Sequence, residues 1–176
     1  WSGEAPSAEQ TAALVRDAAR PTERRIQQVQ QALRGGASVD DLHAATGIDP
    51  WFLDQMLLME QVAREVAAAP ALSPQILRLA KRHGLSDANV GELRGISAQS
   101  AREIRLSHGI RPVFKAVDTC AAEFQSQTPY YYSTYDQETE VAPRERPAVL
   151  ILGSGPNRIG QGIEFDYSCV HAAQAL

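Results

Sequence analysis

The charged side chains of one glycine-rich segment have the most evident potential for chemistry in this sequence. Arg158, Glu164 and Asp166 share the segment GSGPNRIGQGIEFDY, whose glycines would let the backbone approach a ligand closely. The spacing is not that of a dinucleotide fingerprint, because position 158 is arginine, and it is not a P-loop, because no Gly-Lys-Ser/Thr follows. Acidic groups beside a helix start would also repel a phosphate. We therefore interpret Arg158 as a loop-holding partner of Glu164 or Asp166.

The elements that flank this loop are typical of half a βαβ unit. The run Ala148 to Leu152 is apolar and β-branched and follows Pro147, which predicts a buried strand of a parallel sheet. Tyr167 to Leu176 is expected to begin a helix. The second strand of the unit is absent before Leu176, so we predict a truncated start of a Rossmann-like domain over residues 148–176, with a poorly ordered strand.

Residues 21–125 are expected to form a compact bundle of short helices. Three helix-stop glycines, each soon followed by a capping residue, indicate one helix running directly into the next; the pairs are Gly47 with Asp49, Gly84 with Ser86, and Gly95 with Ser97. Further caps are predicted at Thr22, Ser38 and Ser73. Residues 1–20 are alanine-rich and are expected to be a poorly ordered or loosely helical lead-in.

The longest predicted helix starts at Pro50. One of its faces is expected to comprise Phe52, Met56, Met59, Ala63 and Val66. Leu53 and Leu57 widen that face beyond an ordinary amphipathic stripe, which predicts burial on more than one side.

Residues 126–147 are expected to be a tyrosine-rich linker. Three adjacent tyrosines, Tyr130 to Tyr132, cannot all face one side of an element, so we expect them to pin a connector to its flanking domains. Their neighbours are acidic, which disfavours a platform that stacks nucleic-acid bases.

Composition narrows the function classes further. The 176 residues carry a net charge of −4, have no run long enough to span a bilayer, and do not begin like a signal peptide, so a cytoplasmic protein is expected. Cys120 and Cys169 lack metal-site spacing, and no catalytic or metal-binding set is evident. A helix-turn-helix domain over residues 76–106 is the alternative, but the local charge of +5 between Arg78 and Lys115 is modest for nucleic-acid binding.

The glycine-rich segment, from Gly153 to Leu176, resembles the opening of the second half of the large subunit of carbamoyl phosphate synthase. Three upstream segments are similar to parts of the same family: TGIDPWFL from Thr46, VDTCAAEF from Val117, and YYSTY from Tyr131. The similar segments occur in the family's order and cover roughly residues 21–176.

The resemblance implies a parent enzyme with two ATP-grasp halves, an ATP-dependent carbon–nitrogen ligase. One half makes carboxyphosphate and then carbamate from bicarbonate and ammonia, and the other phosphorylates carbamate. Glutamine would supply the ammonia through a small glutaminase subunit, and the product would serve pyrimidine and arginine biosynthesis. The helical domain between the halves is involved in oligomerisation, so a homo-oligomer and the remaining large-subunit domains are the implied partners, with no nucleic acid or membrane.

The resemblance also implies what this chain would lack and what its loop would border. The segments that hold ATP and Mg²⁺ would lie outside it, so no catalytic residue, cofactor or activity is expected in this chain alone. Gly162, Ile163 and Glu164 would border the internal passage that carries carbamate. There the glycine would leave room for a small molecule and the glutamate would supply a polar wall.

Overall fold

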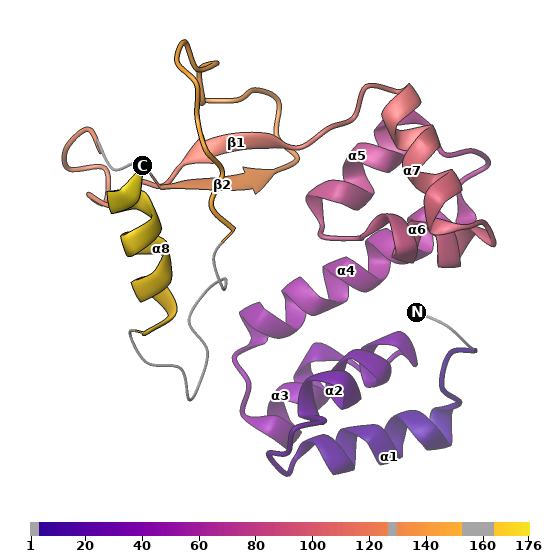
Figure 1. The fold of residues 1–176 in the computed structure, drawn as a ribbon. Coiled ribbons are helices and arrows are strands. Elements are labelled where there is room, and N and C mark those ends of the chain that lie inside the picture. Colours follow the sequence, from indigo (N-terminus) through magenta and orange to yellow (C-terminus); the bar gives the residue numbers. More distant parts are fainter. Residues whose placement is uncertain (1–3, 127–129, 153–163) are drawn as a thin grey trace. The chain divides into compact units, whose positions relative to one another are not determined.

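The computed structural model describes residues 4–126, 130–152 and 164–176 (Figure 1). The chain divides into two units, Trp1–Glu140 and Val141–Leu176. The first unit contains α1 (Ala8–Ala18), α2 (Arg25–Arg34), α3 (Val39–Thr46), α4 (Pro50–Ala68), α5 (Pro74–Arg82), α6 (Asp87–Arg94), α7 (Ala98–Ser107), β1 (Val113–Ala116) and β2 (Tyr131–Thr134). The second unit contains α8 (Glu164–Ala175). The predicted mainly helical fold is confirmed.

Two hydrophobic cores lie at the two ends of α4. The first is formed by α1, α2, α3 and the N-terminal half of α4, with Val29, Leu33, Leu42 and Leu53 buried at its centre. The second is formed by α5, α6, α7 and the C-terminal half of α4, with Val62, Val66, Leu77, Leu85, Val90 and Ile110 buried. The helical part is thus two small groups of helices that share one long helix (Figure 1).

The shared helix buries different sides in its two halves. Burial on more than one side was predicted, but the predicted single face is wrong for Phe52 and Met59, which are exposed. Leu53 is buried in the first core instead, and Val62 and Val66 are buried in the second. The predicted face fails because each half of α4 has its own covering group, so no single stripe is buried along the whole helix.

Most of the predicted helix ends are confirmed. The three predicted stop glycines have positive φ: Gly47 at 69°, Gly84 at 82° and Gly95 at 66°. Capping hydroxyls or carboxylates precede α3, α4, α5, α6 and α7, at Ser38, Asp49, Ser73, Ser86 and Ser97. Thr22 is not a cap, because its carbonyl accepts from Arg25 N and closes a separate turn, after which α2 begins.

The first helix corrects the expectation for residues 1–20. Ser7 and Gln10 form a capping box at the start of α1. Ala18 of this helix is fully buried in the first core, with Leu14 and Val15 packed beside it. The helical domain therefore begins before residue 21, because the small alanines of α1 allow it to pack closely on its neighbours.

A two-stranded antiparallel sheet occupies part of the predicted linker. Val113 pairs with Thr134 and Ala116 with Tyr131. Tyr130, Tyr131 and Tyr132 remain more than half exposed, whereas Tyr135 packs against the second core. The outer edge of β1 is covered by Glu140, whose backbone N–H donates to Phe114 O at 2.8 Å and whose carboxylate accepts from Ala116 N at 2.8 Å. The ordered connector thus extends the first unit to Glu140.

In the second unit, the strand predicted over residues 148–152 is not formed. These residues carry no strand pairing, and Leu150 and Leu152 are exposed. A strand needs a hydrogen-bonded neighbour, and the described residues of this unit provide only α8. The predicted helix is present and begins at Glu164, three residues earlier than Tyr167.

Candidate functional site

The structure leaves the predicted loop site untested. Arg158, Gly162 and Ile163 lie outside the described residues. Glu164 and Asp166 are described only as backbone in the first turn of α8. The predicted ion pairs of this loop, and the predicted lining of a carbamate passage, stay predictions.

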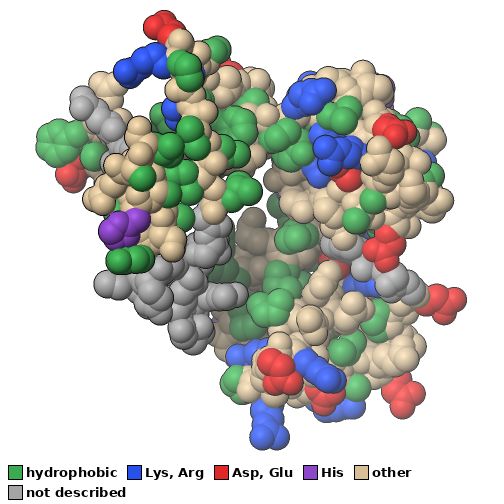
Figure 2. Space-filling view, viewed as in Figure 1, with side chains coloured by type: hydrophobic (Ala, Val, Ile, Leu, Met, Phe, Trp, Pro, Cys, Tyr) green, Lys and Arg blue, Asp and Glu red, His purple; other side chains and the backbone are tan. Residues whose placement is uncertain are grey.

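A cluster of large apolar side chains is exposed on the N-terminal half of α4. Trp51 is 61% exposed, Phe52 58%, Met59 40% and Leu58 37%. The Trp51 and Phe52 rings contact each other edge to face, with centroids 5.0 Å apart. In Figure 2, hydrophobic side chains drawn in green reach the surface where α4 runs in the same view of Figure 1. We call these four residues the α4 face.

The α4 face continues a stripe that is buried further along the same helix. Trp51, Leu58 and the buried Val62 and Val66 follow one another at spacings of seven, four and four residues, which keeps them on one side of a helix. Helices α5, α6 and α7 cover the C-terminal half of this stripe. Its N-terminal half has the same apolar character and no cover among the described residues.

The opposite side of α4 shows the reverse arrangement. Its N-terminal half is covered by the first core through Leu53, and its C-terminal half borders a hollow of about 500 Å³. Glu60, Arg64 and Ala67 of α4 line this hollow together with Arg34 of α2. The side left open at the C-terminal half therefore carries two charged side chains, Glu60 and Arg64, among small apolar residues, whereas the four residues of the α4 face carry no charge.

Glu60 is a buried carboxylate beside this hollow. It is 2% exposed, and its Oε1 accepts from Gln30 Nε2 at 3.4 Å. Burial raises the pKa of Glu60 above its ordinary value, opposed by the Gln30 hydrogen bond and by the charges of Arg34 and Arg64. Sequence periodicity does not identify Glu60 as buried, because it marks charged residues as exposed.

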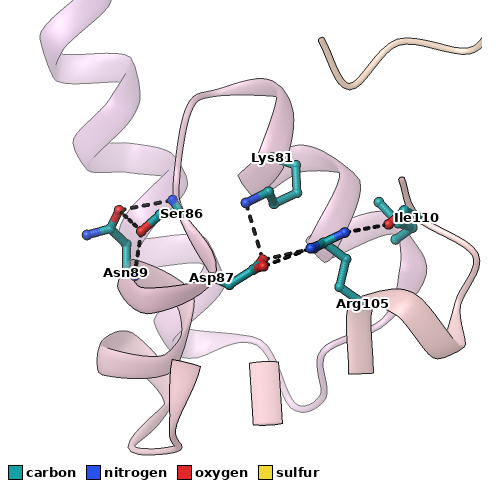
Figure 3. A network of polar contacts seen from close by, with 6 residues as sticks. All are labelled: Lys81, Ser86, Asp87, Asn89, Arg105 and Ile110. Carbon is teal, nitrogen blue, oxygen red and sulfur yellow. Dashed lines mark hydrogen bonds and ion pairs between the residues drawn. The ribbon is translucent and has the colours of Figure 1, made fainter. Parts of the chain in front are cut away.

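A buried polar network holds the second core together (Figure 3). The Asp87 carboxylate accepts from Arg105 Nε at 2.9 Å, from Arg105 Nη2 at 2.8 Å and from Lys81 Nζ at 3.2 Å. Arg105 Nη1 also donates to Ile110 O at 2.7 Å. Asp87 follows the Ser86–Asn89 capping box at the start of α6. The network therefore joins α5, α6 and α7 to Ile110, which follows α7 in the chain.

The same cations hold the connector that follows the helices. Lys81 Nζ lies 5.0 Å and Arg105 Cζ 5.7 Å from the centroid of the Tyr135 ring. Arg82 donates to Tyr135 O at 3.3 Å and pairs with Asp136 at 3.2 Å. These contacts attach the segment after β2 to the second helical group.

Side chains of the types that bind metal ions lie apart from one another in the described residues. Within them no group of three or more His, Cys, Asp or Glu side chains is placed to hold a metal ion. Cys120 is half-buried. His83, at the C-terminal cap of α5, contacts Leu79 O through Nδ1 at 2.9 Å. In the same described ranges, every helix is too short or too polar to cross a membrane.

Comparison with protein families gives two matches. The family described as "Carbamoyl-phosphate synthetase large chain, oligomerisation domain" matches residues 2–109. The family described as "Carbamoyl phosphate synthase preATP-grasp domain" matches residues 145–176. The first match contains the whole segment for which a helix-turn-helix was the alternative, and nothing in the comparisons favours that alternative.

Curated relatives give the same family. The chain is 66% identical over 176 residues to the carbamoyl phosphate synthase large chain of Beutenbergia cavernae, covering 100% of this chain and 16% of that protein. It is 60% identical over 165 residues to the large chain of Streptomyces avermitilis, covering 94% of this chain and 15% of that protein. It is 56% identical over 179 residues to the large chain of Bifidobacterium longum, covering 100% and 16%. The chain thus spans about one sixth of the length of these relatives, and it belongs to the family of carbamoyl-phosphate synthetase large chain oligomerisation domains.

Proposed function

We propose that this chain is the oligomerisation and interdomain connecting part of a carbamoyl phosphate synthase large subunit, and that its helical part self-associates. The observation that carries the proposal is the α4 face, which is exposed among the described residues of a chain matched to an oligomerisation family. A contiguous apolar surface on a soluble domain marks an interaction site.

The connecting role is supported by the way the chain leaves the helices. Tyr135 and Asp136 are held by α5 and α7, and Glu140 covers the edge of β1. The helical group and the connector to Glu140 form one unit, and the segment matched to the preATP-grasp family begins at residue 145. The junction between the two parts then lies in residues 141–144, a shorter segment than the predicted linker of 126–147.

The parent protein is proposed to make carbamoyl phosphate from bicarbonate, ammonia drawn from glutamine, and ATP. In that proposal a small glutaminase subunit is a partner, ATP and Mg²⁺ bind in ATP-grasp segments outside this chain, and the enzyme works in the cytoplasm for pyrimidine and arginine biosynthesis. The chain alone is proposed to be inactive, and Gly162, Ile163 and Glu164 are proposed to border the carbamate passage. The names of the relatives support the enzyme family, and the finer points rest on the resemblance.

Sedimentation velocity over a concentration series tests the proposed self-association of the chain. We expect a reversible increase of the weight-average mass with concentration. A mass that stays at the monomer value up to millimolar protein would overturn self-association. ATP hydrolysis by the purified chain, measured in parallel with Mg²⁺ present, is expected to stay at the buffer background. Hydrolysis above that background that follows the chain through purification would contradict the proposed inactivity.

A further inference from the structure

We infer that the outer edge of β2 (Tyr131–Thr134) is a strand-addition site, and that an extended segment of the same large subunit, downstream of Leu176, pairs with it. The inference rests on the proposed function, which makes this chain part of that subunit. It adds a second surface, on the connector, and the kind of segment that occupies it.

The register of the sheet determines which backbone groups of β2 face away from β1. Val117 N donates to Tyr130 O at 2.8 Å, so these two residues form a hydrogen-bonded pair. Bonded and non-bonded pairs alternate along an antiparallel ladder. The bonded residues of β2 are therefore every second residue after Tyr130, and the N–H and C=O groups of Tyr131 and Ser133 point to the outer edge.

The two edges of this sheet differ in their cover (Figure 1). On the β1 side the outward groups belong to Phe114 and Ala116. Glu140 N donates to Phe114 O at 2.8 Å, and the Glu140 carboxylate accepts from Ala116 N at 2.8 Å. On the β2 side the outward groups of Tyr131 and Ser133 have no hydrogen-bond partner among the described residues. The sheet thus has one covered edge and one open edge.

The composition of β2 leaves this edge available for pairing. Proteins block exposed edges with charged side chains or proline, whereas β2 contains only tyrosine, serine and threonine. Tyr131 and Phe114 lie on one face of the sheet, because Tyr131 pairs with Ala116, two residues from Phe114. They are 54% and 49% exposed. A strand added beside β2 would place every second side chain next to Tyr131, and we expect those side chains to be apolar.

The length of the open edge favours a segment of the same polypeptide over a separate molecule. Its two N–H and two C=O groups can form only four hydrogen bonds, and each contributes little net free energy in water. Two separate molecules lose translational and rotational freedom when they bind, which so short an edge does not offset. A tethered segment has an effective concentration in the millimolar range and avoids most of this loss.

The position of β2 in the chain favours a downstream segment. Thr134 ends β2, and the match to the preATP-grasp family begins at residue 145. Tyr135 packs against the second core and Glu140 binds β1, so the junction that follows is short. The chain covers only 16% of the Beutenbergia cavernae protein, which leaves most of a large subunit to supply the added strand. The domain that follows the junction is tethered nearest to the open edge.

Hydrogen exchange at single-residue resolution is the first test. In the isolated chain we expect fast exchange at the amides of Tyr131 and Ser133, and slower exchange at Tyr132 and Thr134, whose amides point to β1. In the full-length large subunit, exchange at Tyr131 and Ser133 should slow at least about tenfold. Fast exchange at both amides in the full-length protein would overturn strand addition. Slowing in the isolated chain that grows with protein concentration would assign the edge to a second copy and overturn the proposed occupant.

Photo-cross-linking identifies the occupant. Tyr131 is replaced by p-benzoylphenylalanine in the full-length large subunit with its small subunit, and cross-linked peptides are identified by mass spectrometry. We expect an intramolecular cross-link to a peptide downstream of Leu176. The control replaces Phe124, an exposed aromatic residue between the two strands, and should not give that peptide. A cross-link from position 131 to an upstream segment, a second copy or the small subunit would overturn the proposed occupant.

Proline substitution tests whether backbone pairing holds the segment. Ser133→Pro removes one outward N–H, and proline is tolerated at such positions of edge strands. The isolated variant should keep the thermal midpoint of wild type, whereas the cross-link from position 131 in the full-length protein should decrease several-fold. Ser133→Ala, which retains the N–H, is the matched control and should leave the yield unchanged. Equal yields from the two variants would overturn backbone pairing.

The outcomes separate this inference from the proposed function. A full-length protein that makes carbamoyl phosphate while Tyr131 and Ser133 exchange fast would overturn strand addition, and the proposed function would stand. A coding sequence in which no further large-subunit domains follow this chain would overturn both.

Discussion

Asp87, the first residue of α6, binds Arg105 in the last turn of α7 through two parallel hydrogen bonds of 2.9 and 2.8 Å. The Arg105 side chain is 6% exposed and the Asp87 side chain 20%. Lys81 joins the same carboxylate from α5. Arg105 also contacts the ring of Tyr135, which attaches the connector to the second helical group. Loss of the Asp87–Arg105 pair is therefore expected to weaken both the packing of these helices and the attachment of the connector.

Replacing Asp87 tests how much this network stabilises the fold. Asp87→Asn leaves two buried cations without their carboxylate, and we expect the free energy of unfolding at pH 7 to fall by about 3 kcal/mol. Urea denaturation followed by circular dichroism measures the change. The control is Asp136→Asn, which breaks the exposed pair with Arg82 and is expected to have a much smaller effect.

The contribution of Asp87 should also depend on pH. The hydrogen bonds from Arg105, with Lys81 assisting and partial burial opposing, lower the pKa of Asp87 below its ordinary value of 3.8. The folded state then binds the proton less tightly than the unfolded state, so the stabilisation is present above pH 3.8 and is lost as pH falls through the folded pKa. The difference between wild type and Asp87→Asn should shrink below about pH 4. A difference that stays constant down to pH 2 would contradict this.

Glu60 should show the opposite pH dependence. Burial raises its pKa above the ordinary value of 4.5, so the folded state binds the proton more tightly than the unfolded state. Stability is then highest at pH below 4.5 and decreases as pH rises through the folded pKa. Glu60→Gln should be more stable than wild type at pH 7 and similar to it at pH 4. Urea denaturation of both at the two pH values, with the exposed Glu65→Gln as control, checks this.

Helix ends were predictable from sequence because they depend on neighbouring residues. Gly84 must be left-handed for Leu85 N to reach Ala80 O at 3.0 Å, and Ser86 caps the next helix two residues later. These contacts span at most five residues. The sequence pattern contains all of them.

The candidate site was less predictable, because it depends on which helices cover α4. Phe52 and Val62 are both apolar residues of one helix, and periodicity alone gives no reason for one to be exposed and the other buried. Asp87 and Arg105 are 18 residues apart and lie on different helices, so spacing does not reveal their pairing. Glu60 was missed for the same reason, because its burial comes from α2.

Arg94 is expected to stabilise the end of α4 from a neighbouring helix. Its Nη1 lies within hydrogen-bonding distance of Ala67 O at 2.8 Å and Ala69 O at 2.6 Å. Arg94→Ala would leave these helix-end carbonyls without the cation, and we expect a loss of about 2 kcal/mol in the free energy of unfolding. Arg78→Ala, at an exposed position of α5, is the control and should change stability by less than about 0.5 kcal/mol. Equal losses in the two variants would show that Arg94 has no special role.

The apolar run 149–152 should exchange its backbone hydrogens rapidly in this chain. These residues carry no strand pairing, and their side chains are exposed or nearly so. Hydrogen exchange read by NMR should show little protection at Leu150, Ile151 and Leu152, and strong protection at Val62 in α4 as an internal reference. Strong protection of the run in a monomeric sample would mean that it is paired.

Gly91 should be intolerant of even one added methyl group. A Cβ at this position would lie 2.7 Å from Ile96 O and 3.1 Å from Ala98 N, both backbone atoms of the α6–α7 junction. Glycine to alanine inside a helix usually stabilises by about 0.5–1 kcal/mol, but here we expect a loss of about 2 kcal/mol, because overpacking displaces the junction. Thermal and urea denaturation measure the sign. Gly35→Ala is the comparison, since its closest contact would be the Thr11 hydroxyl, so Thr11→Ala should partly rescue it. No side-chain substitution can relieve the backbone contacts at Gly91, and a stabilised Gly91→Ala variant would show that α6 and α7 are further apart than described.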